Sequence, residues 1–388
     1  MARNLASGGA PPGLSNDELV RYSRHLLLPE VGVEGQRSLK SGSVLVVGAG
    51  GLGTPAATYL AAAGVGRIGL VDNDVIEKSN LQRQFLYTEA DLGRSKVDVA
   101  RARLAGINPN VNLEPHNLVL DSTNAMDVLK NYDVVIDGTD NFPTRYLLND
   151  ACVLLGKPDV YASIFRFDGQ ASVFYAKEGP CYRCLFPEPP PPDSVPSCAE
   201  GGVLGVLPGI MGSIQAVQAI NLLLNKGKTL VGRLLVFSAT DTTFTELRIG
   251  KNPECPVCGD NPRVTQLIDY DQFCGLKRNE ASVDREISPT SLKARIDEGR
   301  RPLLLDVREP FEYSICHLPD ALLIPTGALP ARLGELNPAG EIVVYCHTGV
   351  RSARAVELLR AAGFAKARNL TGGIRAWSLE VDHTMPQY

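Results

Sequence analysis

The stretch Val44–Arg83 constrains the fold of this chain more than any other. It begins with an apolar run, Val44–Val47, of the kind that a buried parallel strand requires. A glycine-rich turn follows, Gly48–Gly53, and leads into small residues that favour a helix. A second apolar strand, Ile68–Val71, then ends at an aspartate. The pattern predicts a strand–turn–helix–strand unit that holds a nucleotide.

Each part of this unit has a physical role. Glycines such as Gly51 let the backbone turn tightly and approach phosphate. The N-terminus of the helix, expected from about Thr54 to Ala63, offers unpaired N–H groups and the positive end of the helix dipole. Asp72, about 20 residues after the turn, can hydrogen-bond a ribose hydroxyl. The glycine pattern alone fits an NAD-dependent oxidoreductase equally well.

The residues after Asp72 favour ATP over a dinucleotide. The polar segment that follows reads Ser79, Asn80, Leu81, Gln82, Arg83 and Gln84. Lys96 comes next, and Asp140 and Asn141 follow the apolar strand Val134–Asp137. Cations hold the oxygens of a triphosphate, and a carboxylate holds its Mg²⁺. Asp140 is the candidate magnesium ligand because ligands bind beyond the carboxyl ends of parallel strands.

In combination these motifs resemble those of the MoeB/ThiF adenylyltransferases, which are relatives of the ubiquitin-activating enzymes. The resemblance lies in GxGGLG, a following D-x-D, SNLQRQ, Lys96 and the pair Asp140–Asn141, and it spans the first two thirds of the chain. It implies a Rossmann-like α/β domain that uses ATP and Mg²⁺. It also implies a homodimer, in which Arg24 reaches the nucleotide site of the partner subunit.

Two CxxC pairs predict a zinc site. Cys181 and Cys184 form one pair, and Cys255 and Cys258 form the other. Each pair can place two thiolates close together, and four thiolates make a closed tetrahedral site, which is typical of structural zinc. A redox motif or buried free thiols are the alternatives, but a redox CxxC needs a pair at a helix start, and neither pair is expected at one.

The bulk properties narrow the class of protein. A chain of 388 residues suggests two or three domains. The net charge of −4 gives no sign of nucleic-acid or membrane binding, and no apolar run is long enough to span a bilayer. Residues 1–13 lack the apolar core of a secretory signal and are expected to be a flexible tail. Nine cysteines without an export signal favour reduced thiols in a cytoplasmic protein.

The proline-rich segment Pro187–Gly202 is expected to be an exposed, extended loop. It contains Cys198, and the resemblance implies that this thiol forms a thioester or disulfide with the substrate. The adenylyltransferase domain is expected over 14–261, and the mixed stretch 262–287 is interpreted as a linker.

Residues 288–388 begin a second, smaller α/β domain. The apolar strand Glu341–Tyr345 runs directly into Cys346-His347-Thr348-Gly349-Val350-Arg351, and a helix is expected over Ser352–Ala362. Backbone amides at a helix N-terminus stabilise a thiolate, and Arg351 lies nearby in the sequence. A cysteine phosphatase has one more residue between its cysteine and arginine. The shorter loop suits a single terminal sulfur better than a phosphate.

The motifs LLLDVRE, HLPDAL, CHTGVRSARA and GGIRAW resemble a rhodanese-type sulfurtransferase domain. This resemblance implies that Cys346 carries a persulfide. Cys316 replaces the glycine often found before HLPDAL and is interpreted as structural.

The two domains together resemble the fused MoeB–rhodanese proteins. The resemblance implies ATP-dependent adenylation of the C-terminal glycine of a ubiquitin-like sulfur carrier of the MoaD, ThiS or CysO type. Persulfide transfer then gives a thiocarboxylate for molybdopterin, thiamin, cysteine or tRNA sulfur chemistry, with thiosulfate or a cysteine desulfurase as sulfur donor. Arg24, Arg83 and Lys96 are expected to neutralise the triphosphate. The alternatives are an NAD-dependent oxidoreductase fused to a phosphatase-like domain, and a non-catalytic binder of ubiquitin-like proteins.

Overall fold

The structure is a computed structural model that describes residues 13–190, 201–275 and 285–388. The chain divides into two compact units, Met1–Leu276 and Lys277–Tyr388. Each unit has its own sheet and its own hydrophobic cores.

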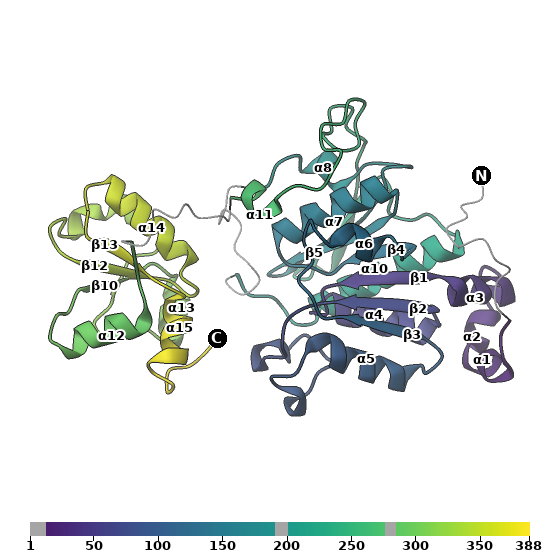
Figure 1. Ribbon diagram of the computed structural model, residues 1–388, viewed down its shortest axis with the longest axis horizontal. Coiled ribbons are helices and arrows are strands. Elements are labelled where there is room, and N and C mark those ends of the chain that lie inside the picture. Colours follow the sequence, from purple (N-terminus) through teal and green to yellow (C-terminus); the bar gives the residue numbers. More distant parts are fainter. Residues whose placement is uncertain (1–12, 191–200, 276–284) are drawn as a thin grey trace. The chain divides into compact units, whose positions relative to one another are not determined.

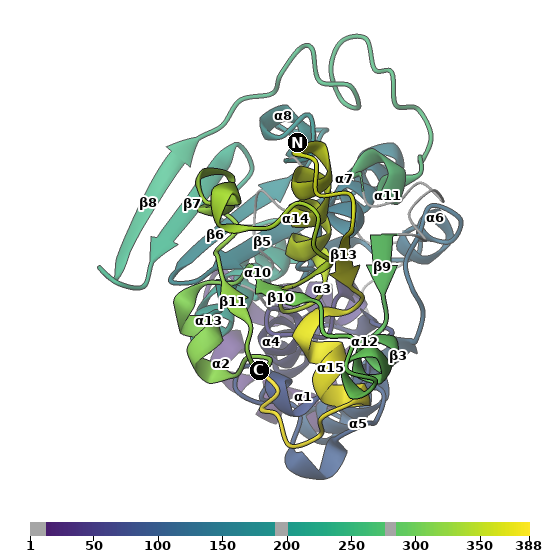
Figure 2. The ribbon, with the colours of Figure 1, turned by 90° about the vertical axis from the view of Figure 1, so that its left-hand side faces the viewer.

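An eight-stranded sheet forms the centre of the first unit (Figure 1). Its order is β3-β2-β1-β4-β5-β6-β7-β8, parallel as far as β5 and antiparallel beyond it. Figure 2 shows β8 at the open edge. The strands are β1 (Ser43–Val47), β2 (Arg67–Val71), β3 (Asn112–His116), β4 (Val134–Asp137), β5 (Asp159–Phe165), β6 (Asp168–Phe174), β7 (Arg233–Ser238) and β8 (Thr243–Arg248).

Helices cover both faces of this sheet. The main ones are α4 (Gly53–Ala63), α5 (Lys96–Ile107), α6 (Ala125–Leu129), α7 (Phe142–Leu155) and α10 (Leu207–Leu224). Residues of α4, α5 and α10 share one core, and residues of α6 and α7 share the other. In β1, Val44 and Val46 join the first core, whereas Leu45 and Val47 join the second. Burial on both faces explains why the strand is an unbroken apolar run.

The sequence of Leu14–Leu39 predicts helical structure with Ser15 or Asn16 as the cap, and this segment forms three helices. They are α1 (Asn16–Arg21), α2 (Ser23–Leu26) and α3 (Gly32–Ser41). Ser15 caps α1 as predicted, accepting a hydrogen bond from the Glu18 N–H. Pro29 lies in the break before α3, where its ring prevents a continuous helix.

Within the described residues, α10 is the one helix long and apolar enough to cross a membrane. Half of its apolar window is buried in this structure. It packs so closely on the turn before α4 that a Cβ at Gly212 would lie 2.4 Å from the Leu52 carbonyl oxygen. Core helices of globular proteins commonly have this composition.

Part of the segment interpreted as a linker packs on the first unit. Residues 270–273 form α11 (Tyr270–Phe273), and the Tyr270 hydroxyl donates to Asp150 at 2.9 Å. The buried Arg183 forms an ion pair with Asp150 and stacks over the Phe273 ring. Residues 276–284 lie outside the described residues. The stretch expected to be linker therefore contributes to the core beneath α7.

The second unit has a five-stranded parallel sheet with the order β11-β10-β12-β13-β9. Its strands are β9 (Glu286–Ile287), β10 (Leu303–Asp306), β11 (Leu322–Leu323), β12 (Ile342–Tyr345) and β13 (Ala367–Leu370). Its helices are α12 (Pro289–Asp297), α13 (Pro310–Ile315), α14 (Val350–Ala361) and α15 (Gly373–Glu380). Separate cores lie on the two faces of the sheet, one under α14 and the other under α12 and α15.

Candidate functional site

The glycine turn between β1 and α4 has two positions with no room for a side chain. Gly48 has φ +91°, and a Cβ there would lie 2.7 Å from the Gly138 carbonyl oxygen. A Cβ on Gly53 would lie 1.8 Å from the Gly48 oxygen. Both positions therefore require glycine. The turns that follow β1 and β4 are thereby brought into direct contact at the carboxyl edge of the sheet.

Asp72, at the end of β2, holds this turn in place. Its carboxylate accepts hydrogen bonds from the N–H groups of Ala49 at 2.8 Å and Asp74 at 2.9 Å. Burial raises the pKa of Asp72, and the nearby Lys96 charge opposes that shift. Lys96, in the first turn of α5, is itself buried and forms a 2.7 Å ion pair with Asp74. Asp72 and Lys96 therefore share the edge of the sheet that carries the glycine turn.

In the polar segment at residues 79–84, some side chains stabilise the segment itself and others lie at the glycine turn. Asn80 is buried, and its side-chain oxygen accepts the Glu77 N–H. Leu81 packs against the core. Arg83 donates to the Ser79 carbonyl oxygen at 2.9 Å, and its Cδ lies 3.5 Å from where a Gly51 Cβ would be. Arg83 therefore lies over the glycine turn, whereas Asn80 and Leu81 hold the segment in shape.

The loop after β4 presents Asp140 and Asn141. Asp140 is exposed, whereas Asn141 caps α7 by accepting the Thr144 N–H at 3.0 Å. Asp137 is fully buried and accepts both the N–H and the hydroxyl of Thr139. Burial raises the pKa of Asp137, and the adjacent Arg145 opposes that shift. The buried Asp137–Arg145 pair thus supports the loop from which Asp140 projects.

Arg24 lies far from the glycine turn of its own chain. It is exposed on α2, next to α1, and Arg21 of α1 donates to the Ile107 carbonyl oxygen at 3.0 Å. Ile107 ends α5, whose 12 residues run from Lys96 at the opposite edge of the sheet. A helix of that length spans about 18 Å. Within one chain, Arg24 and Lys96 are therefore at opposite ends of the first unit.

The four cysteines of the CxxC pairs meet, although 70 residues separate the pairs in sequence. Their sulfur atoms all lie within 4.8 Å of one another. Cys181 is 3.9 Å from Cys184 and 3.5 Å from Cys255, and Cys184 is 3.4 Å from Cys258. A tetrahedral zinc with sulfur ligands at about 2.3 Å requires sulfur–sulfur separations of about 3.8 Å. The expectation that neither pair lies at a helix start is wrong, because Cys181 is the N-cap of α8 (Tyr182–Leu185). The cluster nevertheless fits a metal ion, because all four sulfur atoms converge. Cys198 lies outside the described residues.

In the second unit, Cys346 lies at the base of the predicted loop and is fully buried. Its sulfur accepts hydrogen bonds from the Gly349 N–H at 3.1 Å and from the Ser352 hydroxyl at 3.4 Å. Gly349 has φ +90°. The loop amide of Gly349 binds the sulfur, which is the kind of donor that the sequence pattern predicts, and the Ser352 hydroxyl of α14 is a further donor.

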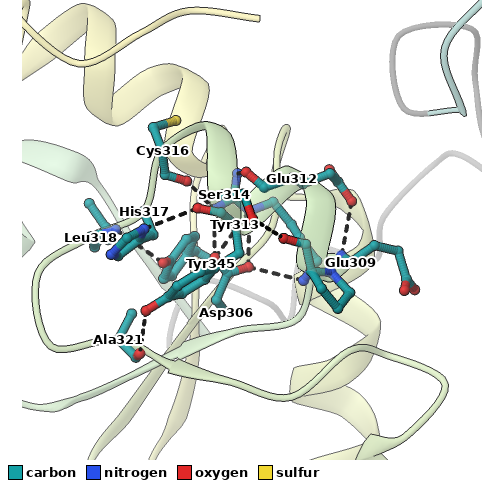
Figure 3. A network of polar contacts seen from close by, with 12 residues as sticks. Asp306, Glu309, Glu312, Tyr313, Ser314, Cys316, His317, Leu318, Ala321 and Tyr345 are labelled. Atoms are coloured by element: carbon teal, nitrogen blue, oxygen red, sulfur yellow. Dashed lines mark hydrogen bonds and ion pairs between the residues drawn. The ribbon is translucent and has the colours of Figure 1, made fainter.

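Arg351 closes the loop but faces a carboxylate. Its two terminal nitrogens each donate to a Glu312 oxygen at 2.7 Å. Nearby, Asp306 and Arg308 form a second, fully buried ion pair. Figure 3 shows Asp306 and Glu312 within this network, together with Tyr345, whose hydroxyl accepts the Leu318 N–H. The ring of Tyr388 stacks on His347, with centroids 4.6 Å apart.

Three residues of these sites were not predicted. Asp74 pairs with Lys96, Ser352 donates to Cys346, and Glu312 binds Arg351. The D-x-D and CHTGVRS motifs contain the first two, so their sequence signal was present. Glu312 had no local signal, because 39 residues separate it from Arg351. Cys316 is half-buried, and its thiol donates to the Pro386 carbonyl oxygen.

We expect His347→Gln to weaken the pH dependence of stability of the second unit. Burial lowers the pKa of His347, outweighing a hydrogen bond with the Tyr388 backbone. Near pH 6 the His347 imidazole is therefore protonated more in the unfolded chain than in the folded one. Its contribution to the free energy of unfolding is complete above about pH 6.5 and is lost as the pH drops through the pKa of the folded state. The variant should lose less stability between about pH 7 and pH 5.

Urea unfolding of the full chain measures this effect, because its single tryptophan, Trp377, lies in the second unit. His383→Gln removes an exposed imidazole and is the control, which should follow the wild-type profile. Parallel pH profiles for wild type and His347→Gln would contradict the prediction.

Comparison with known proteins confirms both family resemblances. Residues 22–257 match the ThiF family, and residues 288–380 match the rhodanese-like domain. The first unit also shares its fold with a crystal structure of E. coli MccB with MccA-N7isoASN, at TM-score 0.57 and 24% identity over 63% of this chain and 76% of that one.

Relatives that align with nearly the whole chain are named for both an adenylyltransferase and a sulfurtransferase activity. A "Probable adenylyltransferase/sulfurtransferase MoeZ" of Mycobacterium tuberculosis is 48% identical, over 97% of this chain and 96% of that protein. An "Adenylyltransferase and sulfurtransferase MOCS3" of Sus scrofa is 45% identical, over 100% of this chain and 91% of that protein. The chain therefore belongs to the ThiF family, with a rhodanese-like domain following its ThiF domain.

Proposed function

We propose that this chain is an adenylyltransferase and sulfurtransferase that makes a thiocarboxylate on a ubiquitin-like sulfur-carrier protein. The observation that carries the proposal is that a glycine-turn nucleotide site and a cysteine loop occur in one chain, in the order found in relatives named for both activities. An oxidoreductase or a non-catalytic binder has no support among these relatives. The product would supply sulfur for molybdopterin, thiamin, cysteine or tRNA sulfur chemistry, as the resemblance implies.

In the first stage, a terminal carboxylate oxygen of the carrier attacks the α-phosphorus of ATP. A carrier acyl adenylate forms and pyrophosphate leaves. Arg83 and Lys96 neutralise the phosphates, and Asp72 supports the turn that faces the ribose. Asp140 would hold Mg²⁺, which supplies positive charge to the phosphate oxygens. The attack has little need of a general base, so positioning and charge stabilisation supply most of the catalysis.

The second subunit of a homodimer supplies Arg24 in this proposal. The location of Arg24, at the opposite end of the unit from Lys96, supports that assignment. An apolar surface over α4, α10 and β8 is consistent with a protein partner. It lines a cavity of about 820 Å³. The side chains of Tyr59, Val217 and Phe244 on this surface are each more than half exposed. Exposed apolar patches of this kind mark protein contacts.

In the second stage, the terminal sulfur of a Cys346 persulfide attacks the acyl adenylate and displaces AMP. The resulting acyl disulfide links the carrier to Cys346. A thiolate, from Cys198 or from a thiol reductant, then attacks the Cys346 sulfur. The thiocarboxylate leaves and a new disulfide forms. Among the described cysteines none is disulfide-bonded, which supports a reducing, cytoplasmic setting.

Zinc is the proposed occupant of the four-cysteine cluster. Four thiolates fill its tetrahedral coordination and leave no open position, so its role is structural. It links residues 252–259 to the start of α8 (Tyr182–Leu185), and these two segments lie far apart in the sequence.

Cys346→Ala should retain carrier-dependent ATP–pyrophosphate exchange but make no thiocarboxylate, because adenylation and sulfur transfer occur in different domains. Exchange is measured with labelled pyrophosphate, and mass spectrometry of the carrier detects the replacement of oxygen by sulfur. Cys316→Ala is the matched control and should retain both activities. Loss of exchange in Cys346→Ala would contradict the division of labour.

Asp140→Ala should lower exchange by about a hundredfold or more, because the metal loses its carboxylate ligand. Asp241→Ala, at another exposed loop of the same unit, is the control and should retain exchange. Near-normal exchange in Asp140→Ala at limiting Mg²⁺ would show that another residue holds the metal.

Elemental analysis should find about one zinc per chain, because the four thiolates form one site. Cys255→Ser should lose this zinc and lower the unfolding midpoint of the first unit, since the metal links two distant segments. A zinc-free chain that unfolds at the wild-type midpoint would overturn the assignment.

A further inference from the structure

The arginine that closes the cysteine loop is occupied by a carboxylate. The two 2.7 Å hydrogen bonds from Arg351 to Glu312 form a bidentate pair. Only 3% of the Glu312 side chain and 18% of the Arg351 side chain are exposed. Two-point pairs of this type are directional and strong, and more so when partly buried. The guanidinium is therefore held by a carboxylate of α13.

Glu312 is itself held in place. One of its oxygens accepts the N–H of Glu309, the N-cap residue of α13, at 3.1 Å. Burial raises the pKa of Glu312, but the hydrogen bonds from Arg351 and Glu309 and the Arg351 charge outweigh it and leave the pKa below its usual value. The carboxylate is thus ionised at neutral pH and cancels the charge of Arg351.

A second buried arginine near this pair is also neutralised by a carboxylate. Arg308, the other buried arginine of this region, is paired with Asp306. The residues that precede Glu312 and Arg351 in the sequence are exposed and apolar: Phe311 is 60% exposed and Val350 is 38% exposed. The Glu312–Arg351 pair is therefore neutral and has exposed apolar side chains beside it.

This arrangement matters for the choice of sulfur donor. With thiosulfate, the Cys346 thiolate attacks the outer sulfur, the sulfur–sulfur bond breaks, and sulfite leaves with the electron pair. With a persulfide, the same attack releases a thiolate. Thiosulfate and sulfite are oxyanions, which an available arginine binds through paired N–H groups. A persulfide presents no such oxygens.

We propose that Glu312 is a specificity-determining residue that, by holding Arg351, lowers the affinity of the Cys346 loop for oxyanion sulfur donors. The consequence is discrimination against thiosulfate in favour of a persulfide donor. The inference rests on the proposed role of Cys346 as the sulfur acceptor.

The test is Glu312→Gln in the full chain, with thiosulfate as donor and cyanide as acceptor, followed by thiocyanate formation. Glutamine keeps the size of the side chain but removes its charge. The KM for thiosulfate should fall about tenfold, with kcat within about twofold of wild type, because Arg351 becomes available to the anion. Glu335→Gln, which breaks an exposed pair with Arg332, is the control and should leave KM unchanged.

An unchanged or raised KM in folded Glu312→Gln would overturn the proposal, since a purely structural role predicts loss of kcat. The double variant Glu312→Gln/Arg351→Met should not show the lowered KM for thiosulfate. A KM that stays low in the double variant would show that Arg351 is not involved. Should Glu312→Gln fail to fold, Glu312→Asp tests the same point, because the shorter carboxylate cannot hold both nitrogens. Its KM should fall by a smaller factor, and a KM equal to wild type would again count against the proposal.

Inhibition by inorganic sulfate is an independent test, because sulfate binds as an oxyanion but donates no sulfur. It should inhibit Glu312→Gln at lower concentration than wild type, and equal inhibition would contradict the proposal. Cys346→Ala separates this inference from the function it rests on. Thiocyanate formation by that variant would show that the sulfur acceptor is misassigned, whatever the behaviour of Glu312→Gln.

Discussion

The first unit depends on a backbone contact that excludes every side chain. The turns after β1 and β4 meet so closely that a Cβ on Gly48 would touch the Gly138 carbonyl oxygen. β1 and β4 are paired neighbours in the sheet, with Val47 opposite Asp137. Their contact brings the start of α4, the carboxylate of Asp72 and the loop of Asp140 to one edge. The proposed nucleotide site is a consequence of that packing.

The same local device supports the loop after a central strand in each unit. β4 ends in Asp137 and β10 ends in Asp306, and both carboxylates are fully buried. Each accepts the N–H of the residue two positions later, Thr139 in one case and Arg308 in the other. Each also pairs with a buried arginine. A buried ion pair contributes little net stability but strongly penalises any other arrangement of its loop.

These supports suit a protein that handles two reactive species. A carboxylate activated as an adenylate is captured only if the sulfur arrives in a fixed geometry. In the second unit the Cys346 sulfur is fixed by donors from Gly349 and Ser352, and Arg351 is fixed by Glu312. Charge pairing around this loop therefore serves donor choice as well as structure. The first unit instead keeps Asp140 exposed beside the buried Asp137–Arg145 pair, where the proposed metal could reach it.

The sequence by itself determined the features that depend on neighbouring residues. Glycine turns, apolar strands, the two CxxC pairs and the Cys346 loop have local patterns, because their chemistry needs fixed spacing along the chain. Tertiary structure alone decided which distant charges meet. Glu312 reaches Arg351 across 39 positions, and Arg24 lies at the end of its unit away from Lys96. Such outcomes follow from how helices pack on the sheet, and no short sequence pattern encodes that packing.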